Sequence, residues 1–579
     1  MKNIKKDYMK LRITIVGFFF AACLISIIAK AGYLQIYQSV WLATKAAHQY
    51  ERPIKETGKR GTIYDVNLRE IAVSIDITSI AAYTSKIEDK DFAANMLAKS
   101  LNMRASIIKS TLSSGKPFVW IKRKATPKEV YAVKSLDIEG ICFLSEHSRV
   151  YPQKTLAAQT VGFTGVDGNG LEGLEFYYDN QLKGSDDNFI VLKDALGQGF
   201  NAEKSSGDNN NGNDLVLTID QAVQYLTEKA LQEAVVDSSA TSGIAMVMVP
   251  KTGAILAMAH YPLINPNSYK QYDKQFWRNR AITDPFEPGS TMKMFTASAA
   301  VEHGDCKPDT VFFCENGQYA VGKHTIHDTH PYGWLTLTEI VKFSSNIGAY
   351  KIVKKIGPEA LYKTLKNFGF GEKTGINCPG ETSGFLASYK NWRNIDVGTI
   401  SFGQGISASP LQLISATSAI ANNGLLMKPF LVQTILDQKG QTIKSFGPTP
   451  VRQAVSPKTA DTIKKILTSV TTKEGTGFNA ILDGYTVCGK TGTAQKVDKT
   501  GRYARGKYIS SFIGFTPVEN PEIAILVIID EPTKSHYGGI VAAPAFKKIA
   551  QETLTYLNVP PNIKEPDRIT VSRESRVLS

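Results

Sequence analysis

An uncharged apolar segment near the N-terminus constrains the topology of the whole chain. It runs for seventeen residues, from Ile13 to Ala29. The stretch before it is basic, with one acid, Asp7, against Lys2, Lys5, Lys6, Lys10 and Arg12. As a helix the segment spans ~25 Å, and the side chains of Arg12 and Lys30 extend it across a ~30 Å hydrocarbon core. Because basic flanks stay in the cytoplasm, we expect a single-pass helix over 13–30, a cytoplasmic tail over 1–12, and the rest on the periplasmic side of the inner membrane.

Two alternatives to an uncleaved anchor remain open. Residues 29–31 read Ala-Lys-Ala, which resembles a signal-peptidase site and would make the segment removable. The stretch "FAAC", ending at Cys23, is similar to a lipoprotein box, although the apolar "LISII" after it makes a poor mature N-terminus. The mass of the mature protein distinguishes these possibilities.

The composition indicates a folded chain with more than one domain. Of 579 residues, 42% are hydrophobic and 21% charged. The length allows two to four domains, because single cores rarely exceed ~250–300 residues. A polar stretch over 203–214 separates mixed strands, turns and short helices from longer apolar runs. We therefore expect one domain over 31–212, a second over 213–556, and a polar tail over 557–579.

The charge balance is basic, with 67 Lys and Arg against 53 Asp and Glu, a formal net charge of +14. Such a balance suits nucleic acid, or equally an anionic envelope surface or polymer. A chain held outside the cytoplasm does not meet nucleic acid. The charge therefore favours the membrane and an anionic wall polymer as partners, and no nucleic acid.

The six cysteines include no C-x-x-C pair, which excludes the zinc-ribbon and thioredoxin motifs. Cys306 and Cys314 are close enough in sequence to close a small loop in an oxidising compartment. A disulfide between them and two separate buried thiols both remain open.

A histidine-rich stretch, "HTIHDTH", places three histidines beside Asp328. Such spacing is compatible with a metal, but the "PYGW" that follows breaks any long helix. We expect a surface loop here, and neither a metal nor another cofactor.

Lys-Thr-Gly occurs four times, and context separates one copy from the others. The copy at Lys251 joins two apolar runs as a hairpin turn, that at Lys373 lies in a Gly-rich loop, and that at Lys499 in a polar hairpin tip. Lys490, in "VCGKTGTAQK", lacks such turn residues and precedes two further strand-like runs. Glycine inside a strand marks a close approach, so Gly492 indicates a strand edge at which a ligand docks.

Ser290 and Lys293 form a Ser-x-x-Lys pair at the start of a predicted helix that runs to about His303. Side chains three residues apart on a helix lie on one face. A serine hydroxyl needs a base within reach, and a lysine serves where burial and the helix dipole favour its neutral form. A second match, Ser113 to Lys116, lies in a polar turn and is accidental. The pair therefore predicts a nucleophile with its own base.

A polar interruption, Ser344-Ser345-Asn346, stands inside the helix-like stretch "LTEIVKFSSNIGAY". Serine and asparagine lower helix propensity, so we expect their polar groups to face a cleft. Ser-x-x-Lys, Ser-x-Asn and Lys-Thr-Gly in this order are the motif set of penicillin-interacting serine enzymes.

With these motifs the chain resembles the class B penicillin-binding proteins over nearly its whole length. "RGTIYDVNLREIAVS" and residues 148–175 resemble the pedestal motifs of that class, and "FGQGISASPLQL" and "YGGIVAAPAF" resemble parts of its catalytic domain. The resemblance assigns structural roles in the pedestal to Arg60, Gly61, Asp65, Arg149 and Glu175. Among these, Arg149 and Glu175 are expected to interlock. Asn67-Leu68 stands where the family usually has a glycine nearby, and "VDGNGLEGLE" is closer to the division type.

The resemblance implies the penicillin-binding transpeptidase fold, an α/β (α+β) architecture. Its antiparallel sheet is flanked by helices and joined to an elongated, dimerisation-like pedestal over 31–212 and a single transmembrane helix. The implied function is a peptidoglycan D,D-transpeptidase that cross-links stem peptides during septal cell-wall synthesis and binds β-lactams. Alternatives are an elongation-type enzyme acting in cell shape and a β-lactam sensor or scaffold. A β-lactamase would need a deacylating base, for which the sequence offers no clear motif.

The resemblance also implies a role for each catalytic motif residue. Ser290 attacks the penultimate D-Ala carbonyl of the stem peptide, with Lys293 as base. Ser344 relays the proton, Lys490 tunes that hydroxyl electrostatically, and Asn346 holds the donor amide.

Substrate binding is assigned by the resemblance to the strand that carries Lys490. The hydroxyls of Thr491 and Thr493 bind the terminal carboxylate, and Gly492 lets the substrate approach. The backbone N–H groups of Ser290 and Thr493 form the oxyanion hole. Expected partners are a multi-span glycosyltransferase and divisome proteins.

Overall fold

The computed structural model describes residues 2–193, 199–200, 211–304, 306–497 and 502–563. The chain divides into two units, one made of residues 1–58 and 184–210 and the other of residues 59–183 and 211–579. Each unit is described by itself below.

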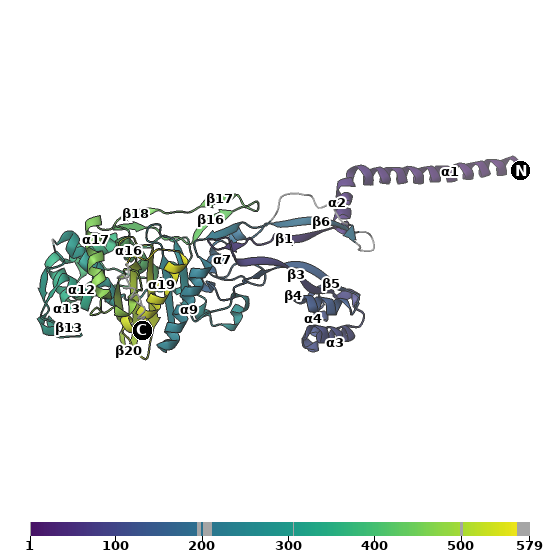
Figure 1. The fold of residues 1–579 in the computed structure, drawn as a ribbon. Coiled ribbons are helices and arrows are strands. Elements are labelled where there is room, and N and C mark those ends of the chain that lie inside the picture. Colours follow the sequence, from purple (N-terminus) through teal and green to yellow (C-terminus); the bar gives the residue numbers. More distant parts are fainter. Residues whose placement is uncertain (1, 194–198, 201–210, 305, 498–501, 564–579) are drawn as a thin grey trace, which may run out of the picture. The chain divides into compact units, whose positions relative to one another are not determined.

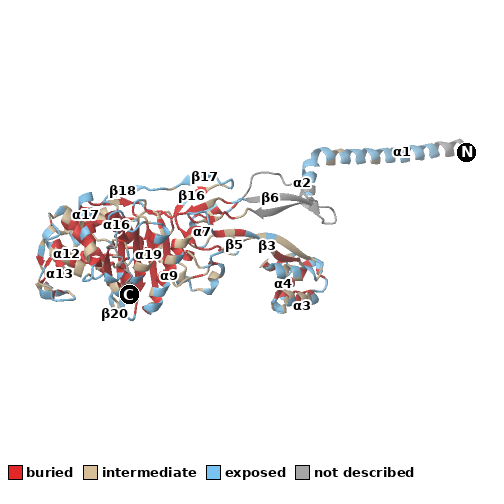
Figure 2. Cartoon of the chain, in the orientation of Figure 1, coloured by how far each residue is buried: buried red, intermediate tan, exposed pale blue. Residues whose placement is uncertain are grey.

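The first unit begins with the helix α1 (Lys2–Gly32), which continues through a π-helical turn, η1 (Tyr33–Tyr37), to α2 (Ser39–Tyr50). A three-stranded sheet follows, in the order β1 (Glu51–Thr57), β6 (Asp186–Lys193), β7 (Gly199–Phe200). Residues 8–37 are long and apolar enough to cross a membrane, with a mean hydropathy of 2.4 and no burial within the span. Figure 2 shows the part of α1 from residue 8 on as almost entirely exposed. The predicted apolar helix is therefore confirmed.

A five-stranded antiparallel sheet, in the order β10-β9-β21-β20-β19, forms the core of the second unit (Figure 1). The strands are β9 (Ser242–Met248), β10 (Ile255–Tyr261), β19 (Cys488–Val497), β20 (Tyr503–Thr516) and β21 (Ile523–Asp530). Both faces of this sheet are buried (Figure 2), so its central strands read as continuous apolar runs.

Helices cover the two faces of the sheet, and alternate residues of β9 show how. Ala245 and Val247 pack with α9 (Gln221–Asp237) and α19 (Ala543–Tyr556). Ile244 and Met246 pack on the opposite side with α11 (Lys293–His303) and α16 (Pro410–Ala421). This two-residue alternation is that of a pleated strand buried on both faces. The predicted antiparallel sheet flanked by helices is confirmed.

Further helices and small hairpins extend the unit beyond α11. They are α12 (Leu337–Phe343), α13 (Asn346–Ile356), α14 (Pro358–Asn367), α15 (Asn394–Ser401) and α17 (Pro457–Thr468). The hairpins pair β11 (Val311–Phe313) with β14 (Trp334–Thr336), β12 (Gln318–Val321) with β13 (His324–His327), and β15 (Leu425–Met427) with β18 (Pro450–Gln453).

A second, seven-stranded sheet has the order β17-β16-β8-β2-β3-β4, with β5 also paired to β3. Its strands are β2 (Ile63–Tyr64), β3 (Glu70–Tyr83), β4 (Phe118–Ala125), β5 (Ile141–Val150), β8 (Asp214–Leu217), β16 (Val432–Leu436) and β17 (Thr442–Ser445). The sheet thus takes strands from both sides of position 212. Most of the polar stretch over 203–214 lies outside the described residues.

Three helices pack on the far end of β3 and β4 and form a separate small core. They are α3 (Lys90–Leu101), α4 (Ala105–Leu112) and α5 (Pro127–Lys134). Ser113, in the accidental Ser-x-x-Lys match, caps the C-terminus of α4.

A buried charge cluster, defined by Arg60, Arg149, Glu175 and Asp179, ties the pedestal motifs together. Glu175 accepts from Arg149 Nε and Arg60 Nε, each at 2.6 Å, and Arg60 also reaches Asp179 at 2.6 Å. Burial alone would raise the pKa of Glu175, but the two arginines outweigh it and hold this pKa below its ordinary value. The carboxylate therefore stays charged in a fully buried position.

The first pedestal turn forms without the glycine usual in the family. Leu68 has φ 59°, in the left-handed region that disfavours a branched side chain. Asp65 stabilises the turn by accepting from the N–H groups of Asn67 at 2.9 Å and Arg69 at 2.8 Å. Gly61 lies against Asn213, whose carbonyl oxygen would stand 1.9 Å from a Cβ at position 61.

Two of the Lys-Thr-Gly copies are confirmed as turns. Gly253, after Lys251, has φ 83° between β9 and β10, and Gly375, after Lys373, has φ 77° in a loop. The copy at Lys499 lies outside the described residues. Asp220 caps α9 and accepts from the N–H groups of Ala222 and Val223 in the first turn.

Of the two alternatives for Cys306 and Cys314, the buried thiols are found. Cys314 is unbridged, and its Sγ lies 3.6 Å from Ser345 Oγ and 3.7 Å from the carbonyl of Phe312. The disulfide alternative is therefore wrong, because the Cys314 sulfur is a thiol.

Candidate active site

Ser290 lies in a short 3₁₀ turn, η5 (Gly289–Met292), that leads directly into α11. A 3₁₀ turn eclipses residues i and i+3, so Ser290 stands over Lys293 more directly than in an α-helix. Gly289 has φ 58° and donates its N–H to the carbonyl of Gly403 at 3.0 Å. A Cβ at Gly403 would lie 1.9 Å from the carbonyl of Gly289. The "FGQG" loop therefore fixes the turn that carries Ser290.

The amine of Lys293 is the centre of the site. Its Nζ lies 2.9 Å from Ser290 Oγ. It lies 2.7 Å from the carbonyl and 3.1 Å from the hydroxyl of Ser344, and 2.7 Å from Asn346 Oδ1. Only 1% of this lysine is exposed. Burial lowers its pKa to about 7, although the nearby charge of Asp328 opposes that shift. A large fraction of the amine is therefore neutral near pH 7 and able to accept the Ser290 proton.

The predicted helix interruption is present at Ser344. α12 ends at Phe343, Ser344 takes a left-handed conformation with φ 63°, and Ser345 caps the start of α13. Ser345 Oγ accepts from the N–H of Gly348 at 2.9 Å. The break turns the carbonyl and hydroxyl of Ser344 toward Lys293, which an uninterrupted helix would not allow.

Lys490 stands on β19 and is fully buried. Burial, and then the charge of Lys293, lower its pKa well below the ordinary value. Its Nζ donates to the carbonyl of Thr491 at 3.2 Å and to the Thr491 hydroxyl at 3.3 Å. The charge of Lys293 therefore adds to burial in favouring the neutral form of Lys490.

β19 is the edge strand of its sheet and pairs with β20 alone among the described strands. The Thr491 hydroxyl donates to Thr476 at 3.1 Å, and Thr493 Oγ1 accepts from the N–H of Gly538 at 3.4 Å. A Cβ at Gly492 would stand 2.3 Å from Ser511 Oγ. The missing side chain at 492 thus makes room for the neighbouring strand as well as for any ligand.

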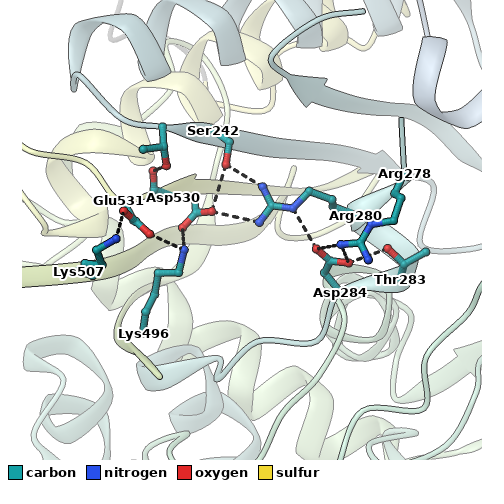
Figure 3. A network of polar contacts seen from close by, with 10 residues as sticks. Ser242, Arg278, Arg280, Thr283, Asp284, Lys496, Lys507, Asp530 and Glu531 are labelled. Atoms are coloured by element: carbon teal, nitrogen blue, oxygen red, sulfur yellow. Dashed lines mark hydrogen bonds and ion pairs between the residues drawn. The ribbon is translucent and has the colours of Figure 1, made fainter. Parts of the chain in front are cut away.

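The far end of β19 is held by a polar network that Figure 3 shows. Lys496 Nζ contacts Asp530 at 2.9 Å and Glu531 at 2.7 Å. The guanidinium of Arg280 lies 3.0 Å from the carboxylate of Asp530 and donates to the hydroxyl of Ser242 at 2.7 Å. It thereby links the end of β21 to the start of β9. Surface ion pairs are individually weak, but several on one partly buried carboxylate fix the direction of the strand.

An open cleft of about 880 Å³ contains the reactive groups. The predicted residues that line it are Ser290, Ser344, Asn346, Thr491 and Thr493. Lys293, Lys490 and Gly492 lie behind these residues. Aromatic side chains make up part of the wall: Tyr332, Phe343, Phe478, Tyr508 and Tyr537. His536 also lines the cleft, with its ring stacked on Tyr508 at 4.5 Å.

Two features of the site were not predicted from the sequence. Gln404, in the "FGQG" loop, lines the cleft. The histidine-rich stretch, expected as a surface loop, instead forms the strand β13, and Asp328 after it contacts α13. The three histidines are exposed or solvent-facing, and no group of three metal-ligating side chains gathers within the described ranges. The signal that could have found it is Asp328 itself, an acidic residue in the histidine-rich stretch, sixteen positions before Ser344.

Known families match the two parts of the chain. The family model of the penicillin-binding protein transpeptidase domain matches residues 243–551, and that of the penicillin-binding protein dimerisation domain matches residues 55–217. The chain is 35% identical over 557 residues to the probable peptidoglycan D,D-transpeptidase PenA of Neisseria meningitidis, covering 95% of this chain and 93% of that protein.

Further similarity extends to a second relative and to solved structures. The peptidoglycan D,D-transpeptidase FtsI of Escherichia coli is 31% identical over 560 residues, covering 95% of this chain and 92% of that protein. A crystal structure of penicillin-binding protein 3 from Mycobacterium tuberculosis, complexed with aztreonam, aligns with a TM-score of 0.69 and 29% identity over 88% of this chain and 98% of that one. The chain belongs to the class B penicillin-binding proteins, a family of peptidoglycan D,D-transpeptidases.

Proposed function

We propose that Ser290 is the acylated nucleophile of a D,D-transpeptidase that cross-links peptidoglycan stem peptides. The observation that carries this proposal is the 2.9 Å contact between Ser290 Oγ and a fully buried lysine amine. A pKa of about 7 lets Lys293 accept a proton at neutral pH.

In the acylation step, Ser290 Oγ attacks the carbonyl carbon of the penultimate D-Ala, and its proton moves to Lys293 Nζ. The C–N bond to the terminal D-Ala then breaks. The leaving amine takes a proton from the Lys293 ammonium through the Ser344 hydroxyl, which lies 3.1 Å from Nζ. The amine of a second stem peptide then attacks the acyl carbon and loses a proton to Lys293 Nζ. The ester bond to Ser290 Oγ breaks, and this oxygen takes the proton back from Lys293.

The donor peptide is proposed to add as a strand along the free edge of β19. Thr491 and Thr493 bind its terminal carboxylate, and Asn346 binds the amide that precedes the scissile bond. The backbone N–H groups of Ser290 and Thr493 are the proposed oxyanion hole, and Lys490 supplies positive potential to the Ser344 hydroxyl.

The cellular setting is part of the proposal. Residues 213–556 are assigned to transpeptidation and residues 31–212 to a pedestal that carries it outside the membrane, with residues 1–12 in the cytoplasm. We assign the septal role on the division-type form of the pedestal motif and propose that a multi-span glycosyltransferase and divisome proteins supply the glycan. A fluorescent fusion that labels the side wall and not the division site would contradict the septal assignment.

The nucleophile is tested by trapping the full-length protein with a fluorescent β-lactam and locating the adduct by mass spectrometry. We expect the adduct on Ser290 and no labelling of Ser290→Ala. Ser113→Ala is the matched control, because it removes the serine of the accidental Ser-x-x-Lys match, and its labelling should be unchanged. An adduct on another side chain would refute the assignment.

A transpeptidase, a β-lactam sensor and a β-lactamase all form a serine adduct, and they differ in how long this adduct persists. Retention for hours agrees with a transpeptidase or a sensor, whereas release within seconds indicates a lactamase. Formation of a cross-linked dimer from a synthetic stem peptide then separates the transpeptidase from a sensor.

A further inference from the structure

One carboxylate beside the site has no role in the chemistry described so far. Asp328 directly follows β13, is half-buried, and faces the start of α13. We propose that Asp328 is a positioning residue that holds the Ser344–Asn346 turn against the amine of Lys293. This inference rests on the serine–lysine chemistry proposed above.

The contacts of Asp328 hold the first turn of α13. Its Oδ1 accepts from the N–H of Asn346 at 2.5 Å and of Ile347 at 3.1 Å, and its Oδ2 accepts from Ser345 Oγ at 2.5 Å. Ser345 Oγ in turn accepts from the N–H of Gly348. The first N–H groups of α13 are thus satisfied by the carboxylate and the cap together, and the helix dipole favours a negative charge there.

Two adjacent residues of the hairpin hold both ends of Asn346. The carbonyl of His327 accepts from Asn346 Nδ2 at 2.9 Å, while Asp328 binds the backbone N–H of the same residue. The side-chain amide is therefore oriented with Oδ1 toward Lys293 Nζ, at 2.7 Å. The N–H of Asp328 donates to the carbonyl of Gly317 at 3.1 Å, which anchors the carboxylate to the hairpin.

The conformation of Ser344 needs such support. A serine with φ 63° persists only where its surroundings fix it on both sides. On one side Lys293 Nζ donates to the Ser344 carbonyl, and on the other Asp328 fixes Ser345, the next residue. Release of Ser345 would free the turn to move away from the amine.

The charge of Asp328 also acts on Lys293. Burial lowers the pKa of Lys293, and Asp328 is the anionic group that opposes the shift. The other charged group that faces Lys293 is Lys490 on β19, while Ser290, Ser344 and Asn346 contribute neutral atoms. Removal of the Asp328 charge alone should therefore lower the pKa of Lys293 further.

The test uses the full-length protein in detergent, with Asp328→Asn, Asp328→Ala and a matched control, Glu315→Gln. Glu315 lies in the same hairpin region and pairs with Lys351 of α13 at 2.6 Å, but does not touch the Ser344–Asn346 turn. The acylation rate with a fluorescent β-lactam is measured from pH 5 to pH 9. In parallel, the reactivity of the Lys293 amine toward acetic anhydride is followed by mass spectrometry, which reports its titration without using Ser290.

We expect the plateau acylation rate to fall about 10-fold in Asp328→Asn and about 100-fold in Asp328→Ala, because the reacting groups lose their placement. In Asp328→Asn the pH midpoints of acylation and of the reaction of Lys293 with acetic anhydride should both fall by about half a unit. The reason is that the negative charge that favours the protonated form of Lys293 is lost. Glu315→Gln should stay within about 2-fold in rate, as expected of an isolated ion pair, and keep both midpoints.

The proposal would be overturned if both Asp328 variants had the same acylation rates and the same pH midpoints as Glu315→Gln. A lower rate with both midpoints unmoved would also overturn it, because that result describes only general support of the hairpin. If Asp328→Ala fails to fold, Asp328→Asn decides, since its midpoints do not depend on the folded fraction. If the unsubstituted protein is not acylated, the proposed function fails, and the titration of Lys293 still tests Asp328.

Discussion

Ionisable side chains are fully buried at two places in this chain, and they have charged partners at only one of them. In the pedestal, Glu175 is enclosed by Arg60 and Arg149 at 2.6 Å each, and its pKa stays low despite burial. In the catalytic domain, Lys293 and Lys490 are equally buried, but no carboxylate lies within ion-pair distance of either amine among the described residues. Burial is the same in both places, and only the partners differ.

The difference separates a structural use of charge from a chemical one. A buried ion with matched partners stays charged and fixes geometry, at a desolvation cost that the partners offset. A buried amine without a counter-ion gives up its proton and becomes a base. The pedestal cluster therefore holds segments of the chain together. The buried lysines instead have lowered pKa values, and their burial lowers the free energy of unfolding.

The largest effect expected is at Lys293. Lys293→Met should lower the acylation rate by at least ~10³-fold, because the base is lost. The same change should raise the free energy of unfolding by about 2 kcal/mol at pH 6, since the folded state no longer carries an amine whose pKa is depressed. The folded pKa of about 7 lies below the ordinary 10.5, so the penalty is full below pH 7 and fades toward pH 10.5. Denaturation at pH 6 and pH 10 measures it.

A stabilisation by Lys293→Met that is equal at both pH values would show that packing, and not proton release, is responsible. A loss of stability at pH 6 would contradict the idea that this lysine is kept at a cost.

The next effect, of opposite sign, is expected in the pedestal. Glu175→Gln removes the carboxylate that two buried guanidinium groups share and leaves Arg60 with Asp179 alone. The change should cost about 3 kcal/mol of unfolding free energy. Glu372→Gln is the matched control, because Glu372 also binds two cations, Lys366 at 2.6 Å and Arg452 at 2.7 Å, but is 40% exposed. Its loss should cost under ~1 kcal/mol. If urea denaturation gave the same loss of unfolding free energy for Glu175→Gln and Glu372→Gln, burial could not be the cause of the loss.

The smallest effect is expected at the first pedestal turn. Leu68 is 61% exposed and has φ 59°, so Leu68→Gly removes backbone strain and little packing. The gain should be about 0.5 kcal/mol, because the relief of a left-handed residue is partly offset by the greater freedom of glycine in the unfolded chain. Thermal unfolding detects it as a rise in Tm, and a fall would show that the Leu68 side chain makes contacts that matter.

The Ser-x-x-Lys spacing predicted correctly that Ser290 and Lys293 lie together. Ser290 and Lys293 are adjacent in one turn, so local helix geometry alone brings them within 2.9 Å. The break at Ser344 also follows from local preferences, since serine and asparagine favour caps over helix interiors. The apolar N-terminal helix could likewise be read from its uncharged run, whereas the antiparallel sheet with its flanking helices was implied by the family resemblance.

Other features could not be read in this way. The stretch around His327 was predicted as a surface loop because the "PYGW" after it breaks any long helix. Its first part instead forms a strand that brings Asp328 against the start of α13, although Asp328 lies eighteen positions before Asn346 in sequence. Gly492 indicated ligand approach, but its Cβ position is closed by Ser511 on the adjacent strand. Such contacts depend on which distant segments meet, and no local preference encodes that.

The sequence by itself determined that Ser290 and Lys293 meet, because a serine and a lysine three residues apart need only one helical turn. Tertiary structure alone decided the protonation of those side chains. Lys293 and Lys490 lie 197 positions apart in the chain. The packing of η5, directly before α11, against β19 helps to remove both amines from water and places the charge of Lys293 near Lys490. Desolvation is a property of the assembled core, so it has no counterpart in the order of the residues.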